Sequence, residues 1–140
     1  MTVSYKRSLI TCILFGFLFI FLSVYFYIVG PQAYLDTKIH FVINSIVFVL
    51  TFGAFITMLI FTNNKDYVID ERDAYVQRKS YGIGLLVSLI YVFLISIILF
   101  MDNRYTGTVN AAWLWFLAYS TFAFSYFITS LVILFYYNRV

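Results

Sequence analysis

Four long stretches of this chain contain no charged residue, and this feature constrains its fold more than any other. They extend from Ser8 to Leu35, from Ile39 to Asn64, from Ser80 to Met101 and from Tyr105 to Asn138. The chain is 64% hydrophobic and 11% charged, whereas soluble domains carry roughly 25% charged residues. A soluble domain of this length could not bury so much apolar surface. The sequence therefore predicts an integral membrane protein.

Each uncharged run is long enough for one helix that crosses a bilayer, which requires about 20 apolar residues. Gly30 and Pro31 end the first helical stretch, since proline cannot continue a helix and glycine suits its C-terminus. The runs are continuous apolar blocks, unlike the alternating strands of a barrel. We expect an all-α, integral membrane four-helix up-down bundle, a single transmembrane domain over residues 1–140 with helices at about 8–29, 39–61, 80–101 and 110–137.

The first run is expected to be a retained helix. Lys6 and Arg7 precede it, as bases precede the apolar core of a secretory signal peptide. Its apolar core is longer than the roughly 7–15 residues of such a peptide, and no A-x-A cleavage pattern follows.

Basic residues predict the orientation of the chain, because Lys and Arg near the ends of membrane spans remain in the cytoplasm. Two of the nine bases, Lys38 and Arg104, fall on one side of the predicted bundle. The other side carries Lys6, Arg7, Lys65, Arg72, Arg78, Lys79 and Arg139. We expect both termini to be cytoplasmic in a multi-pass protein of the cell membrane. The abundance of Phe, Ile and Tyr favours a bacterium of low GC content, hence a bacterial inner membrane.

One short stretch, Asp70 to Gly84, reads DERDAYVQRKSYGIG and holds three of the six acids and three of the nine bases. It belongs mostly to the predicted cytoplasmic loop, residues 62–79. Asp70 suits the N-cap of a helix that begins in the cytosol, with Asp73 three residues on. Arg78 and Lys79 then lie at headgroup depth, where long basic side chains contact anionic lipids.

Three interpretations of this stretch are open. The first is a solvated helix extension that fixes the topology. The second is a catalytic acid pair of Glu71 and Asp73, although no nucleophile or histidine lies near them in sequence. The third is a docking surface for a membrane or cytosolic protein, formed by Asp70, Glu71, Arg72, Asp73, Arg78 and Lys79.

The same residues carry a resemblance. The D-E-R run of Asp70 to Arg72, followed by Lys79 and an apolar helix, resembles the cytoplasmic loop of small four-span bacterial membrane proteins of unknown function. The resemblance covers Asp70 to Gly84 alone. It implies a place in the membrane and no particular activity.

Ionisable and redox residues exclude several classes of function. No Asp, Glu, Lys or Arg lies within a predicted helix, which argues against a proton-driven antiporter with a buried carboxylate. Cys12 is the single cysteine, which excludes an internal disulfide and a CxxC redox pair. His40 is the single histidine, so a histidine-rich metal or haem site would require a second chain to contribute. We expect no enzymatic activity, no cofactor and no metal. The net charge of +3 gives no reason to expect nucleic acid as a partner.

Polar residues inside the predicted helices have a packing interpretation and a pathway interpretation. Small and hydroxyl residues recur at four-residue spacing, which allows close helix approach in lipid; a polar pathway for a small solute is the alternative. The faces are Cys12 and Gly16; Gly53 and Thr57; Ser80, Gly84, Ser88 and Ser96; and Thr121, Ser125 and Thr129.

His40 and Asn44 share one helix face near the extracytoplasmic end, and Thr51 extends that face seven residues deeper. The amide is expected to bond a neighbouring helix. The alternative is an outward-facing pocket in which Asp36 or Asp102 joins His40 and Asn44.

Two functions remain. The first is a membrane protein that acts through protein contacts in the bilayer, either as an accessory subunit of a membrane complex or as an immunity protein against a toxin or bacteriocin. The second is an oligomeric small transporter, channel or lipid translocator, because four short spans make only a narrow pathway and symmetry would complete it. Lipid, including anionic lipid, and a protein partner or a second copy of the chain are the expected partners.

Overall fold

The chain is almost entirely helical in its computed structural model, which describes residues 3–62 and 70–139. The helices are α1 (Val3–Val29), α2 (Pro31–Asp36), α3 (Lys38–Thr62), α4 (Glu71–Asn103) and α5 (Ala112–Arg139), and these ranges contain no strand. All but the short α2 are long and apolar enough to cross a membrane. The predicted all-α class with four long apolar helices is therefore confirmed.

The turn at Gly30 and Pro31 ends α1 as predicted, and it also begins a helix that was not predicted. Gly30 has a φ of 80°, a left-handed conformation that favours glycine. Pro31 then occupies the first position of α2, where its missing N–H is no loss and its fixed φ suits a helix. α2 turns the chain from the end of α1 into α3.

The start of α4 corrects the extent of the expected loop. Asp70 is the N-cap, and its carboxylate accepts a hydrogen bond of 2.8 Å from the backbone N–H of Glu71. Residues 71–79, expected in the loop as well as in a helix extension, are therefore the first turns of a 33-residue helix. Lys65 and the rest of 63–69 lie outside the described residues.

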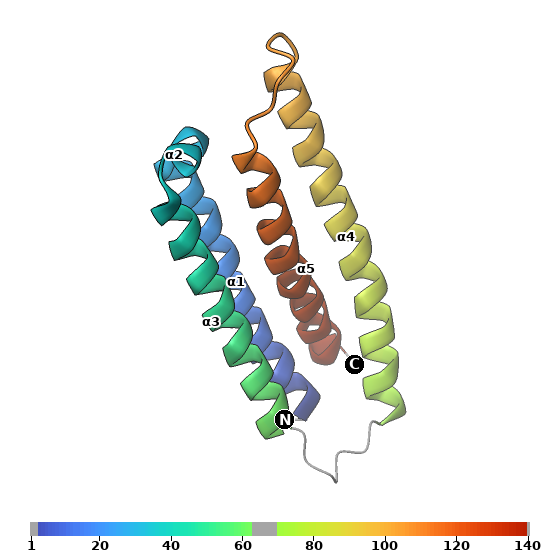
Figure 1. Cartoon of the computed structure of the whole chain (residues 1–140). Helices are drawn as coiled ribbons and strands as arrows, with labels where there is room; N and C mark the ends of the chain where they lie inside the picture. The colour runs from blue at the N-terminus through green and yellow to red at the C-terminus, as the bar shows by residue number, and fades with distance from the viewer. Residues whose placement is uncertain (1–2, 63–69, 140) are drawn as a thin grey trace.

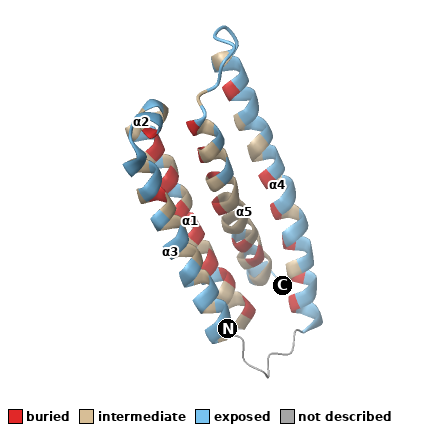
Figure 2. Cartoon of the chain, viewed as in Figure 1, coloured by how far each residue is buried: buried red, intermediate tan, exposed pale blue. Residues whose placement is uncertain are grey.

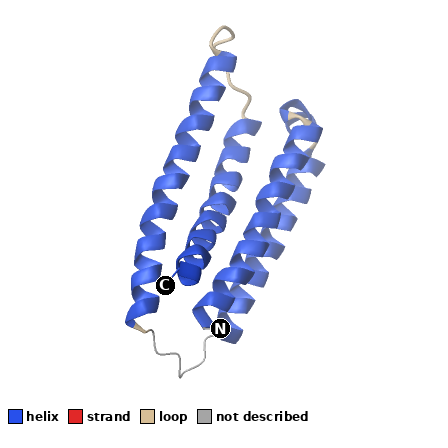
Figure 3. Ribbon diagram, turned by 180° about the vertical axis from the view of Figure 1, so that it is seen from behind, coloured by secondary structure: helices blue, strands red, loops and turns tan. Residues whose placement is uncertain are grey.

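The four long helices alternate in direction, with α5 packed between α1 and α4 (Figure 1), while α3 packs on α1 and also contacts α5 through ring pairs such as Phe48 and Tyr119. α1 begins and α5 ends at one end of the molecule, here called the terminal end; the other is the α2 end. α3 and α4 stand at opposite edges of the assembly, and the view from behind agrees (Figure 3). The bundle is thus open between α3 and α4, where sequence neighbours were expected to pack.

The contact between α1 and α5 is built from rings. Phe15, which is fully buried, stacks on Tyr126 with ring centroids 4.7 Å apart. Nearer the α2 end, Phe26 stacks on Phe116 at 4.5 Å. Gly16 provides space for the ring of Phe127, whose nearest atoms lie 3.0 Å from where a Cβ would be. Aromatic contact area therefore holds these two helices together.

The contact between α4 and α5 is built from small residues. A Cβ on Gly84 would lie 2.2 Å from Thr129 Oγ1 and 3.2 Å from the Thr129 Cα, so only glycine permits this approach. Farther along, the Tyr91 hydroxyl donates to Ser120 Oγ at 3.0 Å. Close approach over small residues is the packing that lipid-exposed helices use.

The edge helices leave most of their apolar surface uncovered. Figure 2 shows α3 mainly exposed and the buried positions of α4 confined to a narrow stripe; Asn44 is the one buried residue of α3. Gly53 and Thr57 are exposed, and α5 occupies the small-residue face of α4. Nothing lies within 4 Å of a Cβ built on Gly53, so the small-residue face expected on α3 does not form a close helix contact there.

Candidate functional site

The expected docking residues at the start of α4 separate into exposed and buried members. Asp70, Glu71, Arg72, Arg78 and Lys79 are exposed. Asp73 is only 5% exposed, and its carboxylate accepts a hydrogen bond from the Tyr137 hydroxyl of α5. The Asp73 carboxylate thus ties α4 to α5, which leaves five residues on the exposed surface.

Lys79 is held by aromatic neighbours at this surface. Its ammonium donates to the Tyr75 hydroxyl at 3.2 Å and lies 5.3 Å from the ring centre of Tyr136. The hydrogen bond to Tyr75, together with the charge interactions with Tyr136 and Tyr75, raises the pKa of Lys79. The exposed start of α4 therefore carries fixed positive charge close to a pair of rings.

The three residues of the polar face expected on the second long helix, His40, Asn44 and Thr51, have different kinds of hydrogen-bond partner in the structure. Asn44 is fully buried, and its amide donates to the Tyr34 hydroxyl of α2. The Tyr25 hydroxyl of α1 lies 2.9 Å from His40 Nδ1. Thr51 instead bonds to the Val47 carbonyl of its own helix at 2.9 Å. The expected interhelical amide bond is present, but Thr51 does not join it.

The partners of His40 and Asn44 are two tyrosines. Asp36 and Asp102, which were expected as alternatives, are both exposed and do not join them. The Tyr34 ring also packs on Phe26 and Trp115. Burial raises the pKa of the Tyr34 phenol to about 12, despite the opposing effect of its bond with Asn44. This cluster fills the space between α1, α2, α3 and α5, so it is a closed packing element of the α2 end.

A second polar cluster, missed by the sequence analysis, surrounds an open cleft at the terminal end. The cleft, here called the terminal cleft, has a volume of about 570 Å³, within the roughly 300–1,000 Å³ of ligand sites. It is lined by all four long helices: Ser4, Arg7, Ser8 and Thr11 of α1, Phe55 and Leu59 of α3, Gln77 and Tyr81 of α4, and Ser125, Tyr126, Thr129, Ser130 and Ile133 of α5.

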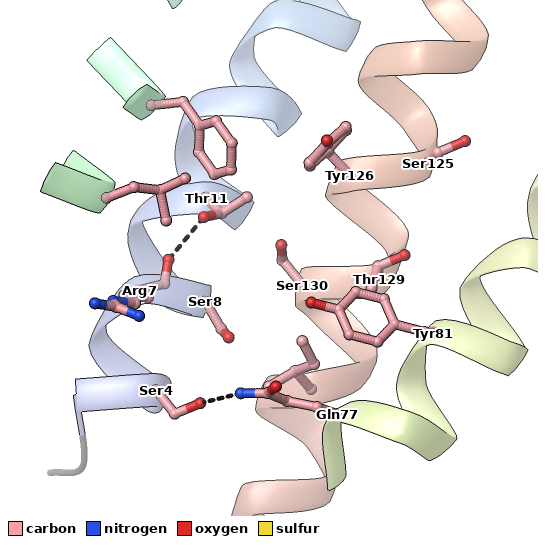
Figure 4. A pocket seen from close by; sticks show the side chains of 13 residues that line it. Ser4, Arg7, Ser8, Thr11, Gln77, Tyr81, Ser125, Tyr126, Thr129 and Ser130 are labelled. Carbon is pink, nitrogen blue, oxygen red and sulfur yellow. Dashed lines mark hydrogen bonds between the residues drawn. The ribbon is translucent and has the colours of Figure 1, made fainter. Parts of the chain in front are cut away.

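Several hydroxyl groups face this cleft (Figure 4). The side chains of Ser8, Ser130 and Tyr81 point into it from three different helices. None of the three makes a hydrogen bond to another described residue. Gln77 bridges the floor by donating to Ser4 Oγ at 2.9 Å. The cleft therefore presents hydroxyl donors and acceptors that the described residues do not use.

Arg7 provides positive charge at the wall of the cleft. Its guanidinium turns toward α3, where Nε donates to Thr62 Oγ1 at 2.8 Å and a terminal nitrogen donates to the Thr62 carbonyl. Thr62 is the last residue of α3, so the cation also interacts favourably with the negative end of that helix. Among the described residues that line the cleft, Arg7 alone is charged.

The sequence contained a partial signal for the cleft. Ser4, Ser8 and Thr11 recur at four- and three-residue spacing at the start of α1, and Ser125 and Thr129 are four apart in α5, with Ser130 adjacent to Thr129. Spacings of three and four residues place side chains on one helix face. That the two faces meet depends on α1 packing against α5, which a single sequence does not specify.

Within residues 3–62 and 70–139, no group of three or more His, Cys, Asp and Glu side chains is placed to hold a metal ion. Comparisons of the chain with models of protein families, with curated proteins and with solved structures found no match.

Proposed function

We propose that the chain is a multi-pass membrane protein that acts through contacts with other molecules in the bilayer. The observation that carries this proposal is the open bundle: α3 and α4 are both long and apolar, and they do not close on each other. Exposed side chains such as Phe61 (80%), Ile60 (69%) and Leu50 (67%) would be costly in water. In a bilayer the same surfaces contact lipid or a partner helix without that cost.

The proposed orientation rests on the end of the molecule at which each basic residue lies. Lys6, Arg7, Arg72, Arg78 and Lys79 belong to the first turns of α1 and α4 at the terminal end, and Arg139 ends α5 there. Lys38 and Arg104 belong to the α2 end. Because basic residues favour the cytoplasm, the terminal end and both termini are cytoplasmic in this proposal, with the chain in a bacterial cell membrane.

The role proposed first is that of an accessory subunit of a membrane complex, or of an immunity protein against a membrane-active toxin. The exposed charges at the start of α4 support a partner contact at the cytoplasmic surface, because mixed charges beside rings suit electrostatic recognition. Charged rim residues contribute mainly to association rate and specificity, so their reversal should weaken a partner contact without unfolding the chain.

The test is crosslinking and co-purification of the tagged full chain from its native membrane. The variant Glu71→Lys/Arg78→Glu reverses two exposed charges and leaves the Asp70 cap, the Asp73–Tyr137 hydrogen bond and the contact of Arg72 with Tyr137 in place. The matched control, Asp102→Lys/Arg104→Glu, reverses an exposed pair at the α2 end. Loss of a specific crosslinked protein in the first variant alone supports the proposal; equal recovery from both variants contradicts it.

A lipid-handling role is the second candidate, and the terminal cleft favours it. The cleft joins hydroxyl groups to the apolar side chains of Phe55, Leu59 and Ile133, a combination that suits an amphipathic molecule. Flux of a fluorescent phospholipid across liposomes containing the purified protein tests translocation directly. Flux equal to that of protein-free liposomes contradicts it.

A further inference from the structure

We propose that the terminal cleft binds the phosphate-bearing headgroup of an anionic phospholipid, whose acyl chains leave between α3 and α4. The inference rests on the membrane insertion proposed above, and it adds a ligand class and the residues that hold it.

The position of the cleft along the helices suits a lipid headgroup. Its lining begins at Ser4, in the first turn of α1, and reaches Thr11, a rise of about 10 Å at 1.5 Å per residue. Ile133 and Ser125 cover a similar length of α5. In a chain that crosses a hydrocarbon core of roughly 30 Å, this portion of the helices lies at the boundary between headgroups and hydrocarbon.

The polar lining favours a ligand that is rich in acceptor oxygens. The hydroxyls of Ser8, Ser130 and Tyr81 point into the cleft (Figure 4), and each can donate one hydrogen bond. Among the described residues no carboxylate contributes to the lining. Asp73, one turn before Gln77 in α4, is bonded through its carboxylate to Tyr137. A phosphodiester can accept several such bonds, whereas the described lining offers a cation no carboxylate.

Charge near the cleft favours an anion. Arg7 belongs to the described lining, and its guanidinium turns toward the end of α3, where it is bound to Thr62, so its charge lies at the α1–α3 side of the cleft. Lys6 and Lys79, both exposed, lie at the same end of the molecule. Basic residues at the cytoplasmic surface attract anionic lipid. The exposed acids Asp70 and Glu71 lie at this end too, so the proposed preference for an anionic over a zwitterionic headgroup rests on Arg7, the charged residue of the described lining.

The apolar lining and the open edge favour a lipid over a free phosphate. Phe55 and Leu59 of α3 form one wall and Tyr81 of α4 belongs to the opposite wall. α3 and α4 stand at opposite edges of the bundle (Figure 1), and both line the cleft; in this proposal the acyl chains leave on the side between them. A water-soluble phosphate would leave these apolar side chains without a partner.

The experiment uses the full chain in nanodiscs of phosphatidylcholine and measures binding of added phosphatidylglycerol by native mass spectrometry. The main variant is Ser8→Ala/Ser130→Ala, which removes two hydroxyls without adding volume; Tyr81→Phe is a second, single change. The matched control is Ser96→Ala, because Ser96 is an exposed serine of α4 outside the cleft. We expect each cleft variant to bind phosphatidylglycerol several-fold more weakly, about tenfold for the double variant, and the control to bind as the original chain does.

Three outcomes overturn the inference while the protein remains inserted in the nanodisc. One is equal binding of added labelled phosphatidylcholine; a second is unchanged binding in both cleft variants. The third is competition by inorganic phosphate or glycerol phosphate at the same concentration as the lipid, which would assign the site to a soluble anion. Failure of the chain to enter the nanodisc is a separate result, and it contradicts the proposed membrane function instead.

Discussion

The two ends of the molecule place polar side chains in opposite ways. At the α2 end, Asn44 and Tyr34 are buried and bonded to each other, and rings surround them. At the terminal end, Ser8 and Ser130 line an open cleft and their hydroxyls are unused by the described residues. Buried polar groups that are bonded to protein stabilise and specify a fold. Hydroxyls that face an open cleft are available to a ligand, so the terminal end is the better candidate for function.

The largest effect is expected at the small-residue contact that borders the terminal end. Gly84→Ala forces a Cβ against Thr129, whose backbone cannot retreat without moving α5 from α4. We expect a loss of about 2–3 kcal/mol of unfolding free energy, measured by SDS-induced unfolding in mixed micelles. Gly82→Ala is the matched control, because nothing lies within 4 Å of its added Cβ. Equal stability of the two variants would mean that α4 does not approach α5 so closely.

The next effect separates the closed α2 end from the cleft. Tyr34→Phe removes the hydroxyl that accepts from the Asn44 amide and leaves a buried amide without this partner. The expected loss is about 1–2 kcal/mol by the same unfolding assay, with phosphatidylglycerol binding unchanged. In Tyr34→Phe/Asn44→Leu both polar groups are gone, and most of the loss should be recovered. A double variant as unstable as the sum of both single variants would contradict a coupled pair.

High pH should weaken the α2 end in particular. The folded Tyr34 phenol keeps its proton to about pH 12, whereas an unfolded tyrosine titrates near 10. Above pH 10 the folded chain therefore binds more protons, and stability falls as pH rises. The Tyr34 contribution reaches about 1 kcal/mol by pH 11. Unfolding measured at pH 9 and 11 should show a smaller decrease for Tyr34→Phe than for the original chain; an identical decrease would assign the effect to other tyrosines.

The smallest effect on stability is expected in the cleft itself. Ser8→Ala/Ser130→Ala removes two hydroxyls that bond to no described residue, so the unfolding free energy should change by less than about 0.5 kcal/mol. The comparison of the two ends becomes sharper if this variant loses lipid binding and Tyr34→Phe does not. A loss of stability as large as that of Tyr34→Phe would make the cleft hydroxyls structural.

The sequence predicted the features that depend on local patterns. The uncharged runs predicted the four long helices, Gly30 predicted the end of α1, and Asp70 predicted the cap of α4, because each follows from local chain chemistry. The short helix α2 was missed, although Pro31 at a first helical position is a known signal for a helix start.

The features that depend on long-range packing were not predictable from one sequence. Asn44 was expected to bond a neighbouring helix, but the sequence did not identify Tyr34 as the partner. Tyr34 reaches Asn44 because α2 turns back toward α3. Asp73 was expected with the exposed docking residues, and it is buried because Tyr137 of α5 reaches it. The terminal cleft depends on which helices are neighbours, and the apolar runs do not encode that choice.

The most direct test of the account is the accessibility of the two ends in intact cells. In a Cys12→Ser background, Glu71→Cys places a thiol at the terminal end and Tyr105→Cys places one at the α2 end, where Tyr105 is 92% exposed. A membrane-impermeant maleimide should label residue 105 in intact cells and residue 71 only after permeabilisation. Labelling of both residues in intact cells, or the reverse pattern, would contradict the proposed orientation; recovery of the chain from the soluble fraction would contradict membrane insertion itself.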